Sequence, residues 1–301
     1  MAKRELSAQE EIDMLRGKLY HYSTEASHPI KYWLDTEEPL LHLVMGSPTL
    51  GIPYGKIIEV FGNNSQGKTV LVLDLAACAQ KDGAVVAWVD LESSWDAKWV
   101  TTRGLDPDKV RLFEPYIGTF GKNSKQQRLI AAEQLFEEVE RWLAYKHKQD
   151  PKQKIFVAFD SVAGILTDVE AMGGITDQNM RTNMALPSFL SKLLRRWVAL
   201  ARTYNAMMIF INQLRTGPVM FGNPDKTPGG KAMGFYCAVR VEVKRKKGGF
   251  ITKGTKRLGI KGIIYNVKNK AGEGSQERET VGFKFFWDGR TKFIPATDIT
   301  D

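Results

Sequence analysis

The chain alternates short apolar runs with longer stretches in which apolar positions recur at helical spacing. Five continuous runs are typical of buried strands: residues 56–61, 84–90, 110–114, 155–160 and 206–212. Helical patterns lie between them, at 70–80, 95–103, 122–147 and 187–204. Because strands alternate with helices, we expect an α/β fold with a mainly parallel, doubly wound twisted sheet flanked by helices.

The pattern changes in the last third of the chain. Residues 236–244, 258–267 and 281–287 alternate apolar and polar positions, which favours strands, expected to be antiparallel and at one edge of the sheet. The basic run 244–247 is followed by Gly248 and Gly249, and this predicts a hairpin turn. Near the other end, residues 7–18 predict a helix with Ser7 as its N-cap and Glu10 three residues later. The pattern assigns no element to residues 19–50.

Composition limits the class of protein. A chain of 301 residues with 43% hydrophobic content can bury one large core. No apolar run approaches the ~18 residues of a membrane span, and residues 1–30 are charged rather than signal-like. Cys78 and Cys237 stand far apart, without the spacing of a zinc site. We therefore expect a reduced cytoplasmic protein that does not bind membranes.

Charge is segregated along the chain. Residues 181–270 hold 19 Lys and Arg against two acids, Asp225 and Glu242, although the whole chain has a formal net charge of +9. One interpretation is a solvated basic face. Segregation on this scale favours the other interpretation, a surface that binds a polyanion such as nucleic acid.

The motif GNNSQGKT follows the first apolar run and precedes a helical pattern. It fits G-x-x-x-x-G-K-[ST], the loop whose backbone N–H groups surround the phosphates of a nucleotide at the start of a helix. Its lysine reaches the β- and γ-phosphates, and its final hydroxyl holds Mg²⁺. The alternative is a glycine-rich turn before a helix. The expected nucleotide-binding residues here are Gly62, Asn63, Asn64, Ser65, Gln66, Gly67, Lys68, Thr69 and Val70.

Carboxylates follow two other strand patterns. Asp90 and Glu92 end the run at 84–90, where an α/β sheet presents its strand ends to a ligand. Asp160 closes the apolar run at 155–160 in the manner of a Walker B strand. We expect Thr69 and Asp160 to hold Mg²⁺, the latter through water.

Beyond single motifs, four stretches of the sequence resemble the bacterial RecA recombinases over roughly residues 45–290. These stretches are 62–69, the segment DLE at 90–92 with Asp96 and Trp99, the run 209–224 with Gly229 and Gly230, and 267–270. The third looks like the second DNA-binding loop of the family. The resemblance implies a RecA-like P-loop ATPase core that uses ATP and Mg²⁺.

The resemblance also implies roles for individual residues. Glu92 matches the carboxylate that activates the attacking water, and Gln213 matches the glutamine that senses the γ-phosphate; with Lys68 they form the expected catalytic set. Asp96 and Trp99 match positions that contact adenine, while Lys268 and Lys270 match lysines that reach the neighbouring subunit's γ-phosphate. The DNA-binding positions implied are Met180, Arg181, Arg215, Met220, Phe221, Gly222, Asn223, Gly229 and Gly230.

Plainer interpretations of some of these residues stay open. Trp99 could be a core residue of its helix, and Phe221 a loop aromatic packed into the core. Lys268 and Lys270 could be exposed strand residues. The 244–247 run has no matched role, with a solvated hairpin tip and capture of a DNA duplex as its two interpretations.

The chain departs from the family pattern in three places. A third lysine that acts across subunits falls at Gly234, for which Lys231 is a candidate replacement. Residues 1–45, an N-terminal helix and connecting segment, do not match the family's polymerisation elements, so subunit docking is assigned to them only as a hypothesis. Residues 46–301 are expected to form the ATPase and DNA-binding core. The family's C-terminal domain looks missing, which would suit a compact, phage-encoded recombinase.

Two functions follow as hypotheses. The first is an ATP-dependent homologous DNA recombinase that forms a filament on single-stranded DNA and exchanges strands with a homologous duplex, in a bacterial or phage-infected cell. The second is a DNA-coating or regulatory ATPase that binds DNA without strand exchange. Both share the nucleotide site, and they differ in what the segment around Phe221 does.

Overall fold

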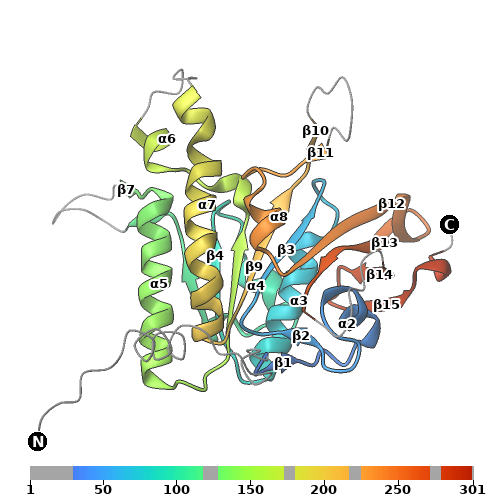
Figure 1. The fold of residues 1–301 in the computed structure, drawn as a ribbon. Coiled ribbons are helices and arrows are strands. Elements are labelled where there is room, and N and C mark those ends of the chain that lie inside the picture. Colours follow the sequence, from blue (N-terminus) through green and yellow to red (C-terminus); the bar gives the residue numbers. More distant parts are fainter. Residues whose placement is uncertain (1–29, 118–127, 173–179, 217–224, 272–278, 300–301) are drawn as a thin grey trace, which may run out of the picture. The chain divides into compact units, whose positions relative to one another are not determined.

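The computed structural model describes residues 30–117, 128–172, 180–216, 225–271 and 279–299 (Figure 1). The chain divides into two compact units, Met1–Lys31 and Tyr32–Asp301. Only residues 30 and 31 of the first unit are described, so the predicted helix at 7–18 lies outside the described residues. The description below concerns the second unit.

The second unit is built around one large sheet. Its nine strands within the described residues run in the order β15-β14-β13-β12-β3-β9-β8-β4-β5. Pairing is parallel from β12 through β3, β9, β8 and β4 to β5. It is antiparallel from β12 through β13 and β14 to β15, so β12 has one parallel and one antiparallel neighbour. This confirms the predicted fold class, including the antiparallel strands at one edge. The strands are β3 (Ile57–Gly62), β4 (Val85–Asp90), β5 (Val110–Phe113), β8 (Ile155–Asp160), β9 (Ala206–Gln213), β12 (Val239–Lys253), β13 (Lys256–Asn269), β14 (Thr280–Phe286) and β15 (Thr291–Pro295).

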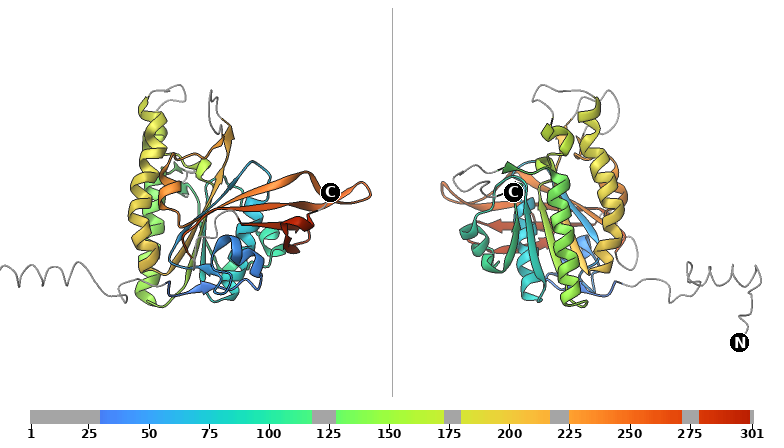
Figure 2. Two further views of the ribbon diagram at one scale, coloured as in Figure 1. Left: turned by 45° about the vertical axis from the view of Figure 1, so that its right-hand side comes forward. Right: turned by 90° about the vertical axis from the view of Figure 1, so that its left-hand side faces the viewer.

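Helices cover both faces of the parallel strands (Figures 1 and 2). The long helices α5 (Ala132–Gln149) and α7 (Met180–Thr203) lie side by side on one face and enclose a core that includes Phe136, Trp197 and Phe159. Helix α3 (Lys68–Lys81) packs on the other face, with nine buried residues. A sheet covered on both faces explains why its central strands read as continuous apolar runs.

Shorter elements connect these layers. Helix α2 (Pro39–Met45) and the glycine after it are held to β13 by two buried amides, since Asn266 donates to the Val44 carbonyl at 2.8 Å and Asn269 to the Gly46 carbonyl at 2.7 Å. Among the described residues, no helix combines the length and apolar character that a membrane crossing requires. The shorter elements are β1 (Trp33–Leu34), α2 (Pro39–Met45), β2 (Ile52–Pro53), α4 (Ala97–Thr102), β6 (Tyr116–Ile117), β7 (Arg128–Leu129), α6 (Asp168–Met172), β10 (Arg215–Thr216), β11 (Asp225–Lys226), α8 (Ala232–Tyr236) and the 3-10 turns at Pro107–Lys109, Val162–Gly164 and Ala296–Asp298.

The prediction of a hairpin turn at Gly248–Gly249 is wrong. Strand β12 continues to Lys253, and the chain turns at residues 254–255 instead. Pairing with β13 breaks after Arg245, opposite Gly262, and resumes at Phe250, opposite Ile260. The segment 246–249 is therefore a bulge within a long strand. The glycine pair marks this bulge because a Cβ at Gly249 would lie 2.5 Å from the Lys261 carbonyl oxygen.

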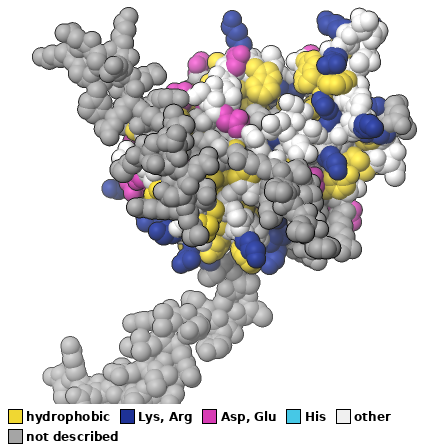
Figure 3. All heavy atoms as spheres, turned by 90° about the horizontal axis from the view of Figure 1, so that it is seen from above, with side chains coloured by type: hydrophobic (Ala, Val, Ile, Leu, Met, Phe, Trp, Pro, Cys, Tyr) yellow, Lys and Arg dark blue, Asp and Glu magenta, His cyan; other side chains and the backbone are white. Residues whose placement is uncertain are grey.

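The β12–β13 hairpin is basic along its length and extends beyond the neighbouring strands (Figure 2). The guanidinium groups of Arg245 and Arg257 lie over the Phe250 ring, 4.6 and 4.0 Å from its centroid. Dark-blue Lys and Arg side chains are visible on the right of Figure 3, the side of this hairpin, and also along the lower edge of the molecule. Its exposed basic residues are Lys244, Lys247, Lys253, Lys256 and Arg257.

Two predicted helix starts are also wrong. Helix α7 begins at Met180 rather than at Pro187, which lies inside the helix and withholds one backbone hydrogen bond without ending it. Helix α5 begins at Ala132, since Arg128–Leu129 pairs with Tyr116–Ile117 as a short strand. In both cases the helix is present as predicted and only its first residue differs.

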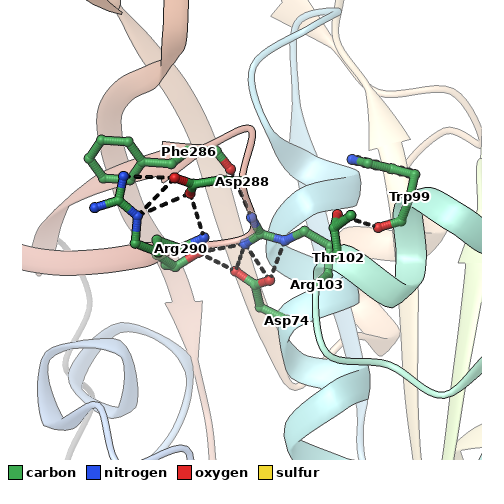
Figure 4. Close-up of polar contacts among 8 residues, drawn as sticks. Asp74, Trp99, Thr102, Arg103, Phe286, Asp288 and Arg290 are labelled. Atoms are coloured by element: carbon green, nitrogen blue, oxygen red, sulfur yellow. Dashed lines mark hydrogen bonds and ion pairs between the residues drawn. The ribbon is translucent and has the colours of Figure 1, made fainter.

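A buried ion pair joins three segments beside α3 (Figure 4). Arg103, which follows α4, donates from Nε to Asp74 of α3 at 2.8 Å and from Nη1 to the Phe286 carbonyl at 3.1 Å. Thr291 of β15 donates to the second Asp74 oxygen at 2.7 Å. These bonds hold the turn between β14 and β15 against α3.

Candidate active site

The predicted phosphate loop lies between β3 and α3. Gly67 takes a φ of +98°, and a Cβ there would lie 2.9 Å from the Phe285 ring, so the turn requires glycine twice over. Lys68 is buried, and its ammonium group donates to the Asn63 carbonyl at 2.7 Å. Burial lowers the pKa of Lys68, while Asp160 and Glu92 act in the opposite direction. Lys68 thus binds a carbonyl of its own loop. A bound phosphate would give the same ammonium group a charged partner.

The Walker B prediction brings a carboxylate to this loop. Asp160, at the end of β8, accepts from the Thr69 hydroxyl at 3.1 Å. Burial, followed in effect by the charges of Glu92 and Asp90, raises the pKa of Asp160 to about 7, against the opposing effects of the Thr69 bond and Lys68. A cation beside Asp160 would offset this burial. A hydroxyl and a carboxylate are oxygen ligands of the kind that Mg²⁺ takes together with phosphate oxygens, so the residues fit that ion.

The segment after β4 forms a pocket next to this pair. Asp90 is buried and accepts from the backbone N–H groups of Ser94 and Trp95, at 3.0 and 2.8 Å. Asp96 caps α4 by accepting from the N–H groups of Lys98 and Trp99. A pocket is lined by Thr69, Leu73, Trp88, Ser94, Trp95, Asp96, Trp99, Val100 and Asp160. The proposed metal-binding residues and the proposed adenine-binding residues thus line one space, with Trp99 partly exposed rather than in the core.

Glu92 lies at the junction of three strand ends. Its Oε1 accepts from Gln213, at the end of β9, at 3.0 Å, and also from the Ser161 hydroxyl next to Asp160. Glu92 itself is exposed. An exposed carboxylate with two donors on one oxygen is held in place while it keeps access to solvent, as a group that orients water needs to be.

Sequence reasoning assigned no role to Ser161 or to Glu59. Ser161 followed the Walker B aspartate and was recognisable as a polar group at a strand end. Glu59 stands in the middle of the apolar run KIIEVF, and it is fully buried in β3. A charged residue in the middle of a buried strand requires a partner, and that requirement was the available signal.

The two lysines expected to act across subunits lie at the end of β13. Lys268 donates to the carbonyl oxygens of Gly234, Phe235 and Cys237, at 2.8, 3.2 and 2.6 Å, and so caps the end of α8. Lys270 is exposed, as is Lys231 at the start of α8. Within one chain, Lys268 therefore caps the end of α8, next to Gly234, the position to which the resemblance assigns a third lysine.

The predicted DNA-binding residues are described only in part. Met220, Phe221, Gly222 and Asn223 lie outside the described residues, and Met180, Arg181 and Arg215 are placed by their backbone only, in α7 and β10. Gly229 is buried with a φ of +89°, and a Cβ there would lie 2.3 Å from Leu190 of α7. The turn at Gly229–Gly230 thus packs against α7, the helix that begins with the predicted DNA-binding residues Met180 and Arg181.

Comparison with known proteins identifies the family. The family described as "RecA N-terminal domain" matches residues 21–135 and 151–283 of this chain. The chain belongs to the RecA family. Relatives named Protein RecA include those of Thermus aquaticus, 37% identical over 230 residues, Acholeplasma laidlawii, 34% over 221 residues, and Rhodopirellula baltica, 33% over 231 residues.

These matches cover most of this chain but less of each relative. They take in 76%, 73% and 76% of this chain, and 61%, 59% and 55% of the respective RecA proteins. The resemblance drawn from the motifs is therefore confirmed at the level of the family. The chain spans about three fifths of the length of the RecA relatives it matches, so the activity of a whole RecA protein comes to it only as a proposal.

Proposed function

We propose that this chain is an ATP-dependent homologous DNA recombinase that assembles as a filament on single-stranded DNA and exchanges strands with a homologous duplex. The observation that carries the proposal is the hydrogen bond between Gln213 and Glu92. It joins the candidate catalytic carboxylate to the strand that leads toward the predicted DNA-binding residues 220–223. A nucleotide-dependent DNA switch requires such a connection between its two ligand sites.

The nucleotide half of the proposal rests on the pocket at the strand ends. When bound, ATP with Mg²⁺ would supply the phosphoryl group and the charge that the loop residues are built to hold. Lys68 would exchange the Asn63 carbonyl for phosphate oxygens, and Thr69 and Asp160 would hold the metal ion, the latter through water. Asp96 and Trp99 would take the base, at the other end of the same pocket.

Glu92 is the proposed group that orients the attacking water. The bonds from Gln213 and Ser161 fix its side chain, so a water on its free oxygen would have a defined direction. Gln213 would lose or lengthen its bond to Glu92 on meeting the γ-phosphate. Movement of Gln213 would then be passed to Arg215 and to the segment beyond it.

The DNA and subunit contacts are the further parts of the proposal. Arg181 and Arg215 would hold phosphates, and Met180, Met220 and Phe221 would insert between bases, while Gly222, Asn223, Gly229 and Gly230 shape the segment. Lys268 and Lys270 would reach the γ-phosphate bound to a neighbouring copy. For Lys268 this means exchanging the α8 carbonyls for the phosphate, as the subunit interface forms.

A strand-transfer assay tests this function. Purified protein is mixed with ATP, Mg²⁺, single-stranded DNA and a labelled duplex, either homologous or unrelated in sequence. We expect transfer of label with the homologous duplex only, and none for Lys68→Ala. ATP hydrolysis stimulated by DNA without any transfer would instead assign the chain to the DNA-coating ATPases.

A further inference from the structure

A buried carboxylate lies in the strand that leads into the phosphate loop. Glu59 is the third of the six residues of β3, three positions before the phosphate loop, and it is fully buried in a strand whose six residues are all buried. Its Oε2 accepts from Arg240 Nε of the neighbouring strand β12 at 2.5 Å. The Arg240 guanidinium also lies over the Phe61 ring, 5.0 Å from its centroid.

The other Glu59 oxygen leads toward the site. Its Oε1 accepts from Asn212 Nδ2 of β9, on the opposite side of β3, at 2.8 Å. The same amide nitrogen donates to the Pro228 carbonyl at 3.2 Å, and Asn212 Oδ1 accepts from the backbone N–H of Gln213 at 2.9 Å. Every polar atom of the Asn212 side chain is therefore committed, and its amide has one orientation that satisfies all three bonds.

These contacts form one continuous path across neighbouring strands. It runs from Arg240 through Glu59 and Asn212 to Gln213, whose side chain ends on Glu92. The bond to Pro228 ties a residue that follows the predicted DNA-binding residues 220–223 to the same amide. The path thus joins the candidate catalytic carboxylate to a residue, Pro228, that follows the predicted DNA-binding residues in the sequence.

We propose that the ion pair of the buried Glu59 with the partly buried Arg240 is a positioning element, which fixes the amide of Asn212 and through it sets Gln213 against Glu92, so that DNA can stimulate hydrolysis. A buried ion pair is a weak source of stability compared with apolar residues of similar volume, because both charges lose their water. Its use here is to present two acceptor oxygens in opposite directions. The functional part of this inference rests on the proposed function, whereas the positioning part does not.

Glu59→Gln is the main test because it keeps the shape and removes one acceptor. An amide offers one acceptor oxygen to the two donors Arg240 Nε and Asn212 Nδ2. If the oxygen faces Arg240, the new NH₂ group faces Asn212, which must turn its own amide over. Its Oδ1 then leaves the Gln213 N–H, and the end of β9 loses the bond that fixes it.

Two further variants separate positioning from folding. Asn212→Ala removes the amide that joins Glu59 to Gln213 and leaves the Glu59–Arg240 pair intact. It therefore tests the same role if Glu59→Gln does not fold. Asp74→Asn is the matched control, since it weakens a buried carboxylate–guanidinium pair that does not lead to Glu92. Thermal melting of each variant records the loss of stability.

The first readout is hydrogen–deuterium exchange of the peptide that covers residues 206–216, without nucleotide or DNA. We expect exchange at the Gln213 amide to become at least tenfold faster in Glu59→Gln and Asn212→Ala, and to stay unchanged in Asp74→Asn. Unchanged exchange in the first two variants would overturn the positioning role. This readout holds whether or not the proposed function is correct.

The second readout is ATP hydrolysis with and without single-stranded DNA. We expect the stimulation by DNA to fall at least tenfold in Glu59→Gln and Asn212→Ala, with the KM for ATP changed less than twofold, and to persist in Asp74→Asn. Faster exchange with undiminished stimulation would overturn the proposal. Absence of stimulation in the unmodified protein would overturn the proposed function, and the exchange experiment would still decide the positioning role.

Discussion

Two largely buried carboxylate–guanidinium pairs flank the phosphate loop in the sequence, at Asp74 of α3 and at Glu59 of β3, and they use the same chemistry differently. At Asp74, Arg103 contacts both carboxylate oxygens, and the remaining bonds go to Thr291 and the Phe286 carbonyl, all within one cluster (Figure 4). At Glu59, one oxygen serves Arg240 and the other serves Asn212. The first pair closes on itself, and the second continues toward the site.

The comparison shows that the role of such a pair depends on the partner of the second carboxylate oxygen. When the guanidinium and its neighbours take both oxygens, the pair connects segments and its loss is felt as stability. When one oxygen is left for a side chain on another strand, the pair also fixes the direction of that side chain. Charge, burial and bond length alone do not distinguish the two cases.

The largest expected effect is the loss of stability on breaking the Asp74–Arg103 pair. Arg103→Met leaves Asp74 buried without its cation and removes the bonds to Phe286 and Thr291. We expect the free energy of unfolding to fall by about 3–5 kcal/mol, the usual result of removing one partner of a buried pair. Urea unfolding followed by circular dichroism measures it.

A control within the same cluster sharpens this result. The double variant Asp74→Asn/Arg103→Met removes both charges and should be less destabilised than Arg103→Met alone, because no unpaired charge stays buried. A single variant as stable as the unmodified protein would show that the pair does not contribute as described.

At Glu92, where the hydrogen-bonded path from Glu59 ends, the expected effect is on the turnover of ATP. Glu92→Gln keeps an oxygen that can accept from Gln213 and loses the base. We expect kcat for ATP hydrolysis to fall about 100-fold or more, as on loss of a general base, with nucleotide affinity preserved since Glu92 does not hold the phosphates. Steady-state kinetics and a fluorescent-nucleotide titration measure the two quantities. A collapse of affinity with normal turnover would contradict the role given to Glu92.

A smaller effect concerns the pH dependence of stability at Asp74. Burial raises the pKa of this carboxyl above its ordinary value, although Arg103 and Thr291 oppose the shift. The folded protein then binds the proton more tightly than the unfolded chain, so Asp74 makes stability fall as pH rises from about 4 through its folded pKa. Asp74→Asn should remove this part of the slope. The check is the free energy of unfolding of both proteins between pH 4 and 7, and parallel curves would contradict it.

The smallest effect is expected for an exposed pair close to the Asp74 cluster. Arg290 donates to Asp288 at 2.7 Å, and both side chains are more than half exposed. Because water screens such a pair, Arg290→Ala should leave the unfolding midpoint unchanged within error. A clear shift in the melting temperature would mean that the turn at 286–291 depends on more than the Arg103 bonds.

The central strands and the phosphate loop could be predicted from the sequence because their signals are local. A continuous apolar run ending in GNNSQGKT indicates a strand, a loop and a helix within one short window, and the structure places Lys68, Thr69 and Asp160 together. The hairpin β12–β13 could not be predicted in full. Its outer part is polar, and it is a strand because it pairs with a partner rather than because of its own pattern.

The two ion pairs could not be predicted because their partners are distant in sequence. Glu59 and Arg240 are 181 residues apart, and Asp74 and Arg103 are 29 residues apart without a motif that connects them. The sequence shows that Glu59 needs a partner. Which of the 43 Lys and Arg residues provides it depends on strand order, and strand order is a property of the fold.

The bulge at 246–249 has a consequence for how this chain can change in length. Four residues of β12 lie opposite the single residue Lys261, between pairs that are fixed on both sides. Residues can be inserted or deleted at this point without altering which residues pair in the rest of the sheet. Because Arg245 at its edge donates its N–H to Gln66 of the phosphate loop, such changes would add or remove basic side chains close to the nucleotide site. The number of positive charges there can therefore evolve separately from the fold.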